Sequence, residues 1–326
     1  MVALPAVADP TLEVMNREIE KRAESEPRPY LGASGVGHEC DRKGWLDFHW
    51  ASKRKINATG AKAIEDGHRS EELMATRLEF VPGVELHRSN EDGRQFGFEA
   101  LGGHMRGNYD GVVVGLLQAP KTPHIWEHKC VNEKKFAKLQ ELIRTHGEKA
   151  SLWHWDIVYY GQAQLYMHHE NLTRHYLTVT TPGGRAEISC RTEYDAEYAM
   201  KQMARARRMI FNTRPLSRVS DNPSWYQCKW CDHYDNCHGD TKPQMNCRTC
   251  MHATPMEDGF WLCARFGATR SVQEQRDGCP AHLYHPDLIA GQQVDAGEDW
   301  VKYVMRNKSV WVDGVDTMPE KLAAKR

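Results

Sequence analysis

Residues 124–131 read HIWEHKCV, and this stretch has the character of a short β-strand. Its isoleucine, tryptophan and valine are the β-branched and aromatic types that fit a pleated sheet. Glu127 and Lys129 lie two positions apart, and because side chains alternate faces along a strand, both project from the same side. As an isolated triplet this pattern is typical of a solvated face with an ion pair. Its meaning therefore depends on what the neighbouring segments place beside it.

The preceding segment supplies a second carboxylate. Asp110 lies in HMRGNYDGVVVG, residues 104–115, among apolar and glycine residues where an unpaired carboxylate is costly. Asp110 and Glu127 are nearly equidistant from the turn at 115–123, so we expect them to face each other. Two facing carboxylates repel unless a cation lies between them, and Mg²⁺ or Mn²⁺ suits oxygen ligands. Lys129 would then lie where a cation can orient an attacking water.

Two further segments carry polar residues that fit the same site. His68 follows a glycine in IEDGHRSEE, residues 64–72, on a predicted helix. Gln162 and Tyr166 are four apart in YYGQAQLYMHH, so they share one helix face. Each of these residues alone is typical of ordinary helix surface or core. Their order along the chain, His, Asp, Glu-x-Lys and Gln-x3-Tyr, is distinctive.

On these residues the sequence resembles the PD-(D/E)XK nucleases, specifically the RecB-like branch. That branch includes the RecB and AddB nuclease domains, CRISPR-associated RecB-like exonucleases and many phage exonucleases. The resemblance covers roughly residues 30–240 and implies a restriction-endonuclease-like α/β (α+β) fold, with a central mixed sheet flanked by helices. It also implies roles for the motif residues. The metal ligands would be His68, Asp110, Glu127 and the backbone carbonyl of His128; Lys129 would position the water; Gln162 and Tyr166 would support the site and the DNA strand.

The order of segments predicts the elements of this fold. Helices are expected at about 38–52, 60–80, 132–145, 151–170 and 194–212. Short alternating segments predict strands at 84–88, 95–101, 104–114, 124–131, 174–180 and 185–190. We divide the chain into a helical extension (1–29), the nuclease domain (30–240), a cysteine-rich ribbon-like module (241–285) and a C-terminal tail (286–326). We expect the module to be independent of the nuclease chemistry.

Seven of the ten cysteines fall between residues 228 and 279, mostly as close pairs, which indicates metal rather than disulfides. Cys228, Cys231 and Cys237 need a fourth ligand, and Cys40 is the natural candidate because no local partner explains it. In the RecB-like branch, one distant N-terminal cysteine with three later ones resembles a 4Fe–4S staple. Thiolate-only ligation also suits zinc, and free thiols are the remaining alternative.

A second set follows, for which we expect a structural zinc site: Cys247, Cys250, Cys263 and Cys279. His252 or His282 could replace one of these cysteines, so the fourth ligand stays open. In another arrangement, four of the five cysteines between residues 228 and 250 form one site together. Cys130 and Cys190 lie in apolar strand contexts and are expected to be small core residues.

The composition limits the function classes. A net charge of −1 over 326 residues, with 27% charged residues, excludes a disordered polyelectrolyte. It offers no global basic signature, so a nucleic-acid site would be a local patch. No apolar run approaches membrane-spanning length, and the first residues, MVALPAVADPTLEV, lack the pattern of a signal peptide. We therefore expect a cytoplasmic protein without membrane contact.

Together these observations predict a metal-dependent DNA exonuclease, of the kind found in phage or mobile-element recombination, repair or degradation. Its partner would be DNA with linear ends, single- or double-stranded, and a recombination or single-strand-binding protein would be a second partner. Two alternatives stay open: an endonuclease of the same fold, and a non-catalytic DNA-binding or scaffold protein that acts through its ribbon.

Overall fold

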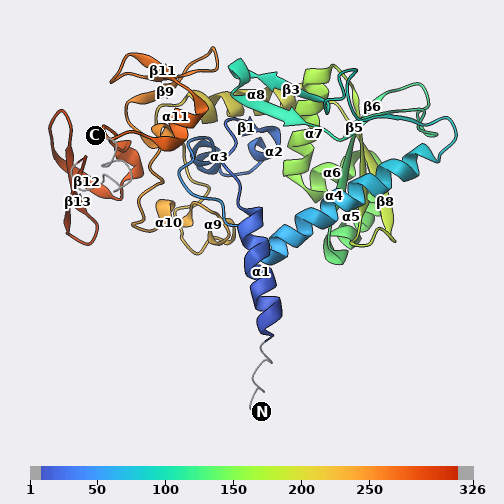
Figure 1. Ribbon diagram of the computed structural model, residues 1–326. Helices are drawn as coiled ribbons and strands as arrows, with labels where there is room; N and C mark the ends of the chain where they lie inside the picture. The colour runs from blue at the N-terminus through green and yellow to red at the C-terminus, as the bar shows by residue number, and fades with distance from the viewer. Residues whose placement is uncertain (1–8, 315–326) are drawn as a thin grey trace.

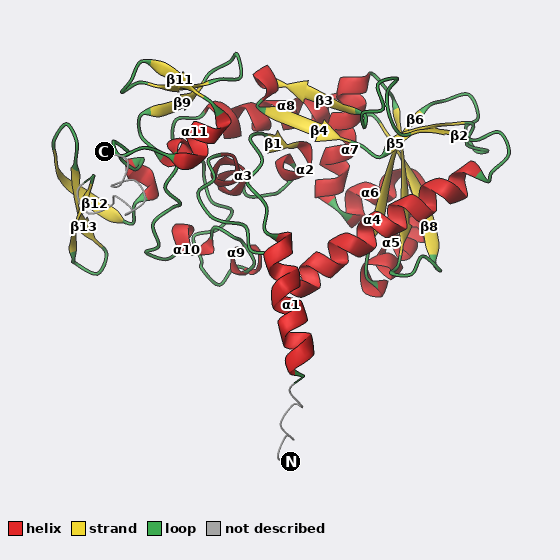
Figure 2. Cartoon of the chain, viewed as in Figure 1, coloured by secondary structure: helices red, strands yellow, loops and turns green. Residues whose placement is uncertain are grey.

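The computed structural model describes residues 9–314 (Figure 1). Residues 1–8 of the predicted extension and 315–326 of the predicted tail lie outside the described residues. The chain has a mixed α/β architecture with several separate sheets (Figure 2), which confirms the predicted fold class. Among the described helices, none combines the length and the apolar character needed to cross a membrane.

A five-stranded sheet organises the larger part of the molecule, with the order β2-β5-β6-β7-β8. Only the β6–β7 pair is parallel among its pairings, so the sheet is mixed, as predicted. The HIWEHKCV stretch forms its middle strand, β6. The strands are β2 Glu85–His87, β5 Gly111–Val114, β6 His124–Cys130, β7 Arg174–Thr180 and β8 Glu187–Glu193.

Helices cover both faces of this sheet. The long helix α4 (Ala58–Glu79) packs Met74 and Leu78 against Trp126 on one face. On the other face α7 (Ile157–Glu170) packs against β6 and β7. Two further helices, α5 (Glu133–His146) and α6 (Glu148–Trp155), extend this second layer. Strand β6 is therefore buried on both sides, and any charge on it must be explained by its neighbours.

Two predicted elements are divided in the structure. The strand expected at 104–114 is two strands, β4 (Met105–Asn108) and β5, which belong to different sheets. The chain bends between them, so Asp110 comes to lie at the start of β5. The helix expected at 151–170 is also two, because Asp156 adopts an extended conformation and caps α7 by accepting hydrogen bonds from Val158 N and Tyr159 N.

The remaining elements of the N-terminal part surround a second, three-stranded sheet of order β1-β4-β3. Helix α1 buries none of its residues and extends away from the body (Figure 1). The bounds are α1 Pro10–Ala23, β1 Leu31–Gly32, α2 Ala33–Val36, α3 Asp41–Phe48, β3 Gly97–Ala100, the 3-10 turn η1 Leu101–Gly103 and α8 Ala196–Phe211.

The cysteine-rich region contains a small antiparallel sheet, and a further sheet follows it within the segment predicted as a tail. That last sheet has its own core, which includes Tyr303 and Trp311. The bounds are α9 Tyr226–Lys229, α10 Tyr234–Cys237, η2 Cys247–Thr249, β9 Ala253–Pro255, β10 Trp261–Cys263, β11 Ala268–Arg270, α11 Val272–Asp277, η3 Pro286–Leu288, β12 Gly291–Ala296, β13 Val301–Met305 and β14 Val310–Asp313.

The cysteine-rich module shares its packing with the N-terminal part. Trp261 belongs to the main hydrophobic core, and its ring lies 5.4 Å from that of Phe48. Arg248 is almost completely buried and donates to the backbone carbonyls of Phe48 and Pro29, each at 2.9 Å. Its guanidinium lies 3.8 Å from the ring centroid of Trp50. The module is therefore packed against the N-terminal part, and its independence of the nuclease chemistry stays a prediction.

Candidate active site

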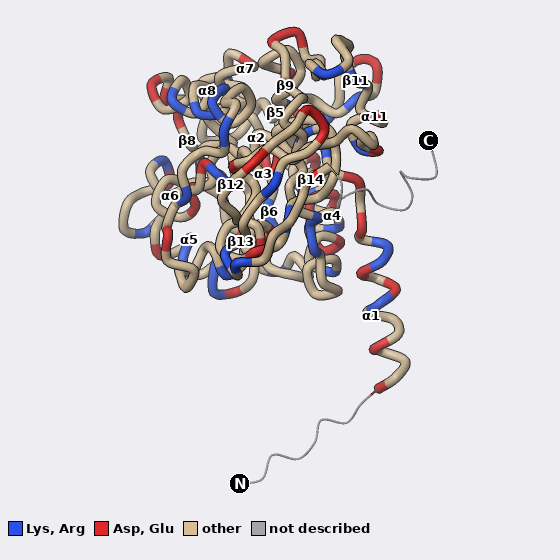
Figure 3. The backbone as a smooth tube through the Cα atoms, turned by 90° about the vertical axis from the view of Figure 1, so that its left-hand side faces the viewer, with Lys and Arg blue, Asp and Glu red and all other residues tan. Residues whose placement is uncertain are grey.

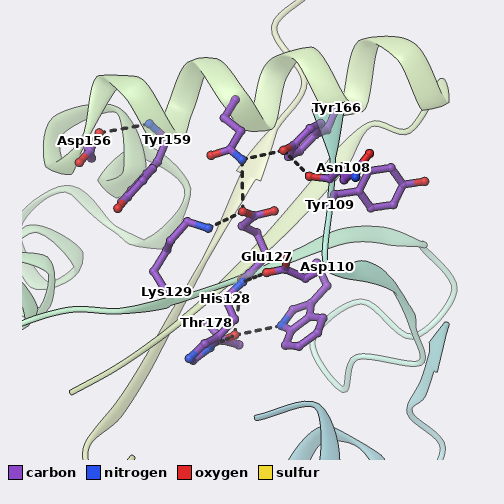
Figure 4. Close-up of polar contacts among 12 residues, drawn as sticks. Asn108, Tyr109, Asp110, Glu127, His128, Lys129, Asp156, Tyr159, Tyr166 and Thr178 are labelled. Atoms are coloured by element: carbon purple, nitrogen blue, oxygen red, sulfur yellow. Dashed lines mark hydrogen bonds and ion pairs between the residues drawn. The ribbon is translucent and has the colours of Figure 1, made fainter. Parts of the chain in front are cut away.

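The alternation of side chains along β6 separates two environments. Trp126 and His128 point toward α4, where the His128 ring hydrogen-bonds with Ser70 at 2.8 Å. Glu127 and Lys129 point toward α7 and contact each other there as an ion pair (Figure 4). The prediction that these two residues share a face is confirmed. The face is not solvated, because Glu127 is only 6% exposed.

Glu127 has one oxygen satisfied and one free. Its Oε1 accepts from Lys129 Nζ and, at 3.3 Å, from Gln162 Nε2. Its Oε2 is buried and has no hydrogen-bond partner among the described residues. A buried carboxylate oxygen without a partner carries a desolvation cost, which a bound cation would remove.

Asp110 lies beside Glu127, as the sequence predicted. Strands β5 and β6 pair Gly111 with Trp126, and the next position in this register places Asp110 opposite Glu127. Asp110 Oδ2 accepts a hydrogen bond of 2.7 Å from the backbone N–H of His128. The carboxylate is thus fixed on the strand that carries Glu127.

The electrostatics of this cluster favour the uptake of positive charge. Burial raises the pKa of Glu127 to about 8, and the neighbouring charges of Asp110 and Glu71 act in the same direction. Burial likewise raises the pKa of Asp110. Burial alone would lower the pKa of Lys129, but Glu127 and Asp110 outweigh it and raise that pKa above its ordinary value. The positive charge of Lys129 therefore lies among carboxylates whose negative charge it does not fully neutralise.

Helix α7 contributes a hydrogen-bonded wall to the site. Gln162 Nε2 donates to Tyr166 Oη at 2.6 Å, and Tyr166 Oη donates to the carbonyl of Asn108 at 2.5 Å (Figure 4). Because Gln162 also reaches Glu127, this chain of bonds connects α7 with both sheets. The structure brings Gln162 and Tyr166 to the predicted carboxylates.

His68 is not brought to the cluster. Its side chain is exposed, and no hydrogen bond or ion pair joins it to Asp110 or Glu127 within the described part of the chain. One turn further along α4, Glu71 takes the place that we expected for His68. Arg88 Nη2 holds Glu71 at 2.9 Å, while burial and then the charge of Asp110 raise the pKa of Glu71.

Glu71 is not among the ligands predicted from the sequence. The available signal was its position three residues after His68, on the same helix face. Glu71 and Glu72 are adjacent acids, and which of them faces the carboxylate cluster depends on the angle at which α4 crosses the sheet.

The carboxylate oxygens of this cluster suit the Mg²⁺ or Mn²⁺ that we expected, although the side chains are not arranged to coordinate a metal ion. Over residues 9–314, no group of three or more His, Cys, Asp or Glu side chains is placed so that it could hold a metal ion as it stands. Glu127 is occupied by Lys129, and Asp110 by the backbone of His128. The carboxylates of Glu71, Asp110 and Glu127, the last with an unpartnered oxygen, nevertheless supply the ligand type that Mg²⁺ and Mn²⁺ prefer.

The first cysteine set gathers from distant parts of the chain. Cys40 precedes α3, Cys228 lies in α9 and Cys237 ends α10. Burial and then the charge of Cys40 raise the pKa of Cys228. Cys40 acts in the same direction on Cys231 and Cys237, although within residues 9–314 the four thiols are not placed so that they could hold a metal ion as they stand. Cys231 also accepts a hydrogen bond from the backbone of His233.

The second cysteine set lines a cavity of about 380 Å³. Its walls include Cys247, Cys250, Cys263, Cys279, His252 and His282. His252 Nε2 and His282 Nδ1 are both buried without a hydrogen-bond partner in the described structure. Cys247 Sγ is turned toward the carbonyl of Glu274 at 3.5 Å. The predicted ligands and both candidate replacements therefore converge, while the choice among them stays open.

Comparisons with known proteins find similarity at the level of solved structures. No protein-family model matches the chain, and no curated protein matches it. Among solved structures, the crystal structure of SSO0001 is similar at 14% identity and a TM-score of 0.38, covering 70% of this chain and 95% of that one. An alkaline exonuclease from Laribacter hongkongensis is similar at 16% identity and a TM-score of 0.39, covering 59% and 90%. The same exonuclease in complex with dAMP gives 15% identity, a TM-score of 0.35 and coverages of 55% and 85%.

Proposed function

We propose that this protein is a metal-dependent deoxyribonuclease that hydrolyses phosphodiester bonds, acting as an exonuclease on linear DNA. The observation that carries the proposal is the unpartnered Glu127 Oε2, buried beside Asp110 and in contact, through Oε1, with Lys129. A structural ion pair would have no use for a third carboxylate or for a buried oxygen left without a bond.

Each residue has a chemical role in this proposal. Asp110, Glu127 and Glu71 would hold Mg²⁺ or Mn²⁺, which when bound would neutralise charge on the scissile phosphate. Lys129 is cationic and borders the same carboxylates, so it can orient a water and stabilise negative charge that develops on the phosphate. Gln162 fixes Glu127, and Tyr166 fixes Gln162, so α7 keeps the carboxylate in place.

We also propose two structural metal sites. Cys40, Cys228, Cys231 and Cys237 would hold a 4Fe–4S cluster that ties the start of the nuclease domain to its end. Cys247, Cys250, Cys263 and Cys279 would hold zinc. The cavity that the second set lines supports this division, which leaves Cys130 and Cys190 in the strands where they pack.

One experiment separates the proposed function from its rivals. The protein is purified without oxygen, its iron and zinc are measured, and end-labelled linear and covalently closed circular DNA are digested with Mg²⁺ or Mn²⁺. Loss of the linear DNA alone indicates an exonuclease, whereas cleavage of the circle indicates an endonuclease. DNA binding without cleavage under any metal would contradict the proposal and favour a non-catalytic binding protein.

A further inference from the structure

Helix α1 is held to the rest of the protein only along its inner half. Asn16 Oδ1 accepts a hydrogen bond of 2.8 Å from Lys62 Nζ, and Glu20 Oε1 accepts one of 2.9 Å from the backbone nitrogen of Ala58, both in α4. Between residues 24 and 311, no group forms a hydrogen bond or ion pair with residues 9–15. The outer turns of α1 therefore project from the body without support (Figure 1).

This helix is too short to be stable without packing. Isolated helices of about 12–15 residues or fewer are marginal in water, because the first turn is costly to form. Helix α1 has 14 residues, and none of them is buried. Asp9 caps it by accepting from Thr11 N and Leu12 N, which favours the helix but does not replace tertiary contacts. A surface that covers the outer turns would therefore stabilise them.

An apolar stripe runs along α1. Leu12, Met15 and Ile19 follow the i, i+3, i+7 spacing that places side chains on one helix face. Leu12 is 49% exposed and Met15 is 42% exposed, whereas Ile19 is half-buried. The stripe is thus most exposed at the outer end of the helix.

The charges of α1 are divided between its two halves. Residues 9–15 carry two acids and no base, whereas residues 16–23 carry three bases and two acids. Figure 3 shows only acidic charge at the outer end of α1 and the basic residues nearer the body. This division also complements the helix dipole. Two such helices side by side in the same direction would bring like halves together, whereas an antiparallel pair brings each acidic half against a basic half.

We propose that α1 is an interaction surface for a second copy of this chain, with the two helices antiparallel about a two-fold axis. In the register that places Met15 of one copy opposite Ile19 of the other, Leu12 lies opposite Arg22, whose aliphatic stem can cover it. The stripe is short compared with a standard interface of about 1,600 Å², so the dimer is expected to be in a concentration-dependent equilibrium with the monomer. This inference does not rest on the proposed nuclease function.

Sedimentation velocity of the full-length chain tests the interface. Over an about 100-fold range of concentration, the wild-type protein should change from monomer to dimer. Leu12→Glu should raise the dimer Kd about 10-fold or more, because it replaces a packed leucine with a charge. An acid in the first turn favours the helix itself, so this variant should stay folded. Phe80→Glu is the matched control, since Phe80 is 74% exposed at the far end of α4. If the wild type stays monomeric, or if the two variants have the same Kd, the interface is wrong.

Charge reversal tests the antiparallel arrangement. A chain with Lys21→Glu and Arg22→Glu has a negative charge in both halves of α1, so it should stay monomeric at concentrations where the wild type pairs. Mixed with a Glu13→Lys chain, it should form the mixed dimer in preference to its own dimer. A reversed chain that dimerises as the wild type does would exclude the antiparallel arrangement.

Amide hydrogen exchange gives an independent measure of which surface is covered. The protection of residues 10–16 should increase with the fraction of dimer, because these turns gain their packing from the second copy. Equal protection at all concentrations would mean that pairing does not cover α1, and the proposal would fail.

Discussion

Asp110 Oδ2 lies 2.7 Å from the backbone nitrogen of His128, so the carboxylate at the start of one strand is bonded to the middle of its neighbour. This bond fixes Asp110 against the strand in which Glu127 and Lys129 flank His128. Because Glu127 faces α7 and Asp110 meets it at the strand end, the two carboxylates belong to a single charged cluster. The predictions below follow from how that cluster is compensated.

Replacing Lys129 with alanine should reduce cleavage by about 100-fold or more, because the cation that borders the developing negative charge is lost. The same change frees Glu127 Oε1 and removes a positive charge beside the carboxylates, so metal affinity should be kept or should rise. Rates on end-labelled DNA and metal titrations measure the two effects. Lys149→Ala serves as the matched control, since Lys149 forms an exposed pair with Glu193. If the Lys129→Ala protein cuts at the wild-type rate, Lys129 has no catalytic role.

Glu71 and Glu72 form a natural comparison, because both bind Arg88 but only Glu71 acts on Asp110 and Glu127. Glu71→Gln should lower metal affinity or activity by about 10-fold or more. Glu72→Gln should leave both close to wild type, because Glu72 is mainly exposed. Isothermal titration with Mn²⁺ and single-turnover cleavage give the two values. Equal effects of the two substitutions would assign the role to Arg88 instead.

The raised pKa of Glu127 predicts a dependence on pH. Between its ordinary value of 4.5 and about 8, the folded metal-free protein holds a proton that the unfolded chain has lost. The free energy of unfolding should therefore fall as pH rises through this window, by about 1 kcal/mol per pH unit. Glu127→Gln should lack this component. Urea unfolding in EDTA from pH 5.5 to 8.5, compared between the two proteins, measures it, and parallel curves would contradict it.

Metal binding should show the opposite trend with pH. The cation competes with the proton on Glu127, so the apparent affinity for Mn²⁺ should increase up to about pH 8 and then level off. Titrations at constant ionic strength test this, and an affinity that does not vary between pH 6 and 8 would exclude Glu127 as a ligand.

Cys40→Ser should remove the colour of protein purified without oxygen and lower its Tm, if the four-cysteine set holds an iron–sulfur cluster. The cluster would close a loop of nearly 200 residues, and closing so long a loop contributes several kcal/mol in the chain-entropy description. Cys190→Ala is the control, because Cys190 is fully buried in β8. If the wild-type protein contains zinc and no iron, the four cysteines form a zinc site and not an iron–sulfur cluster.

Much of the site could be predicted because it depends on local rules. The equal distance of Asp110 and Glu127 from a turn set their pairing, and a spacing of four put Gln162 and Tyr166 on one helix face. Glu71 could not be chosen over His68, since that depends on the angle at which α4 crosses the sheet. Asp156 interrupts a helical pattern because its carboxylate accepts hydrogen bonds from two backbone N–H groups. This cap is a local feature and could have been predicted from the sequence.

The packing between distant segments was beyond the sequence pattern. Arg248 lies between two cysteines, where a solvated arginine would be the ordinary expectation. In the structure it is 3% exposed, and burial lowers its pKa well below the usual range. The positive charge of Arg248 is stabilised by backbone carbonyls and aromatic rings from residues far away in the chain. The sequence around Arg248 therefore does not indicate that it is buried.

The bond from Arg248 to Pro29 has a consequence for how the protein is made. Pro29 stands between Arg28 and Tyr30, which form one wall of a polar pocket that Gln162 and Tyr166 also line. The residue that anchors this wall comes 219 positions later in the chain. A ribosome delivers the N-terminal part first, and domains begin to fold as they emerge. The wall would gain its anchor only when the cysteine-rich module has left the exit tunnel. A nascent chain that already carries Asp110 and Glu127 would thus lack the anchor for residues 28–30 until the cysteine-rich module has been translated.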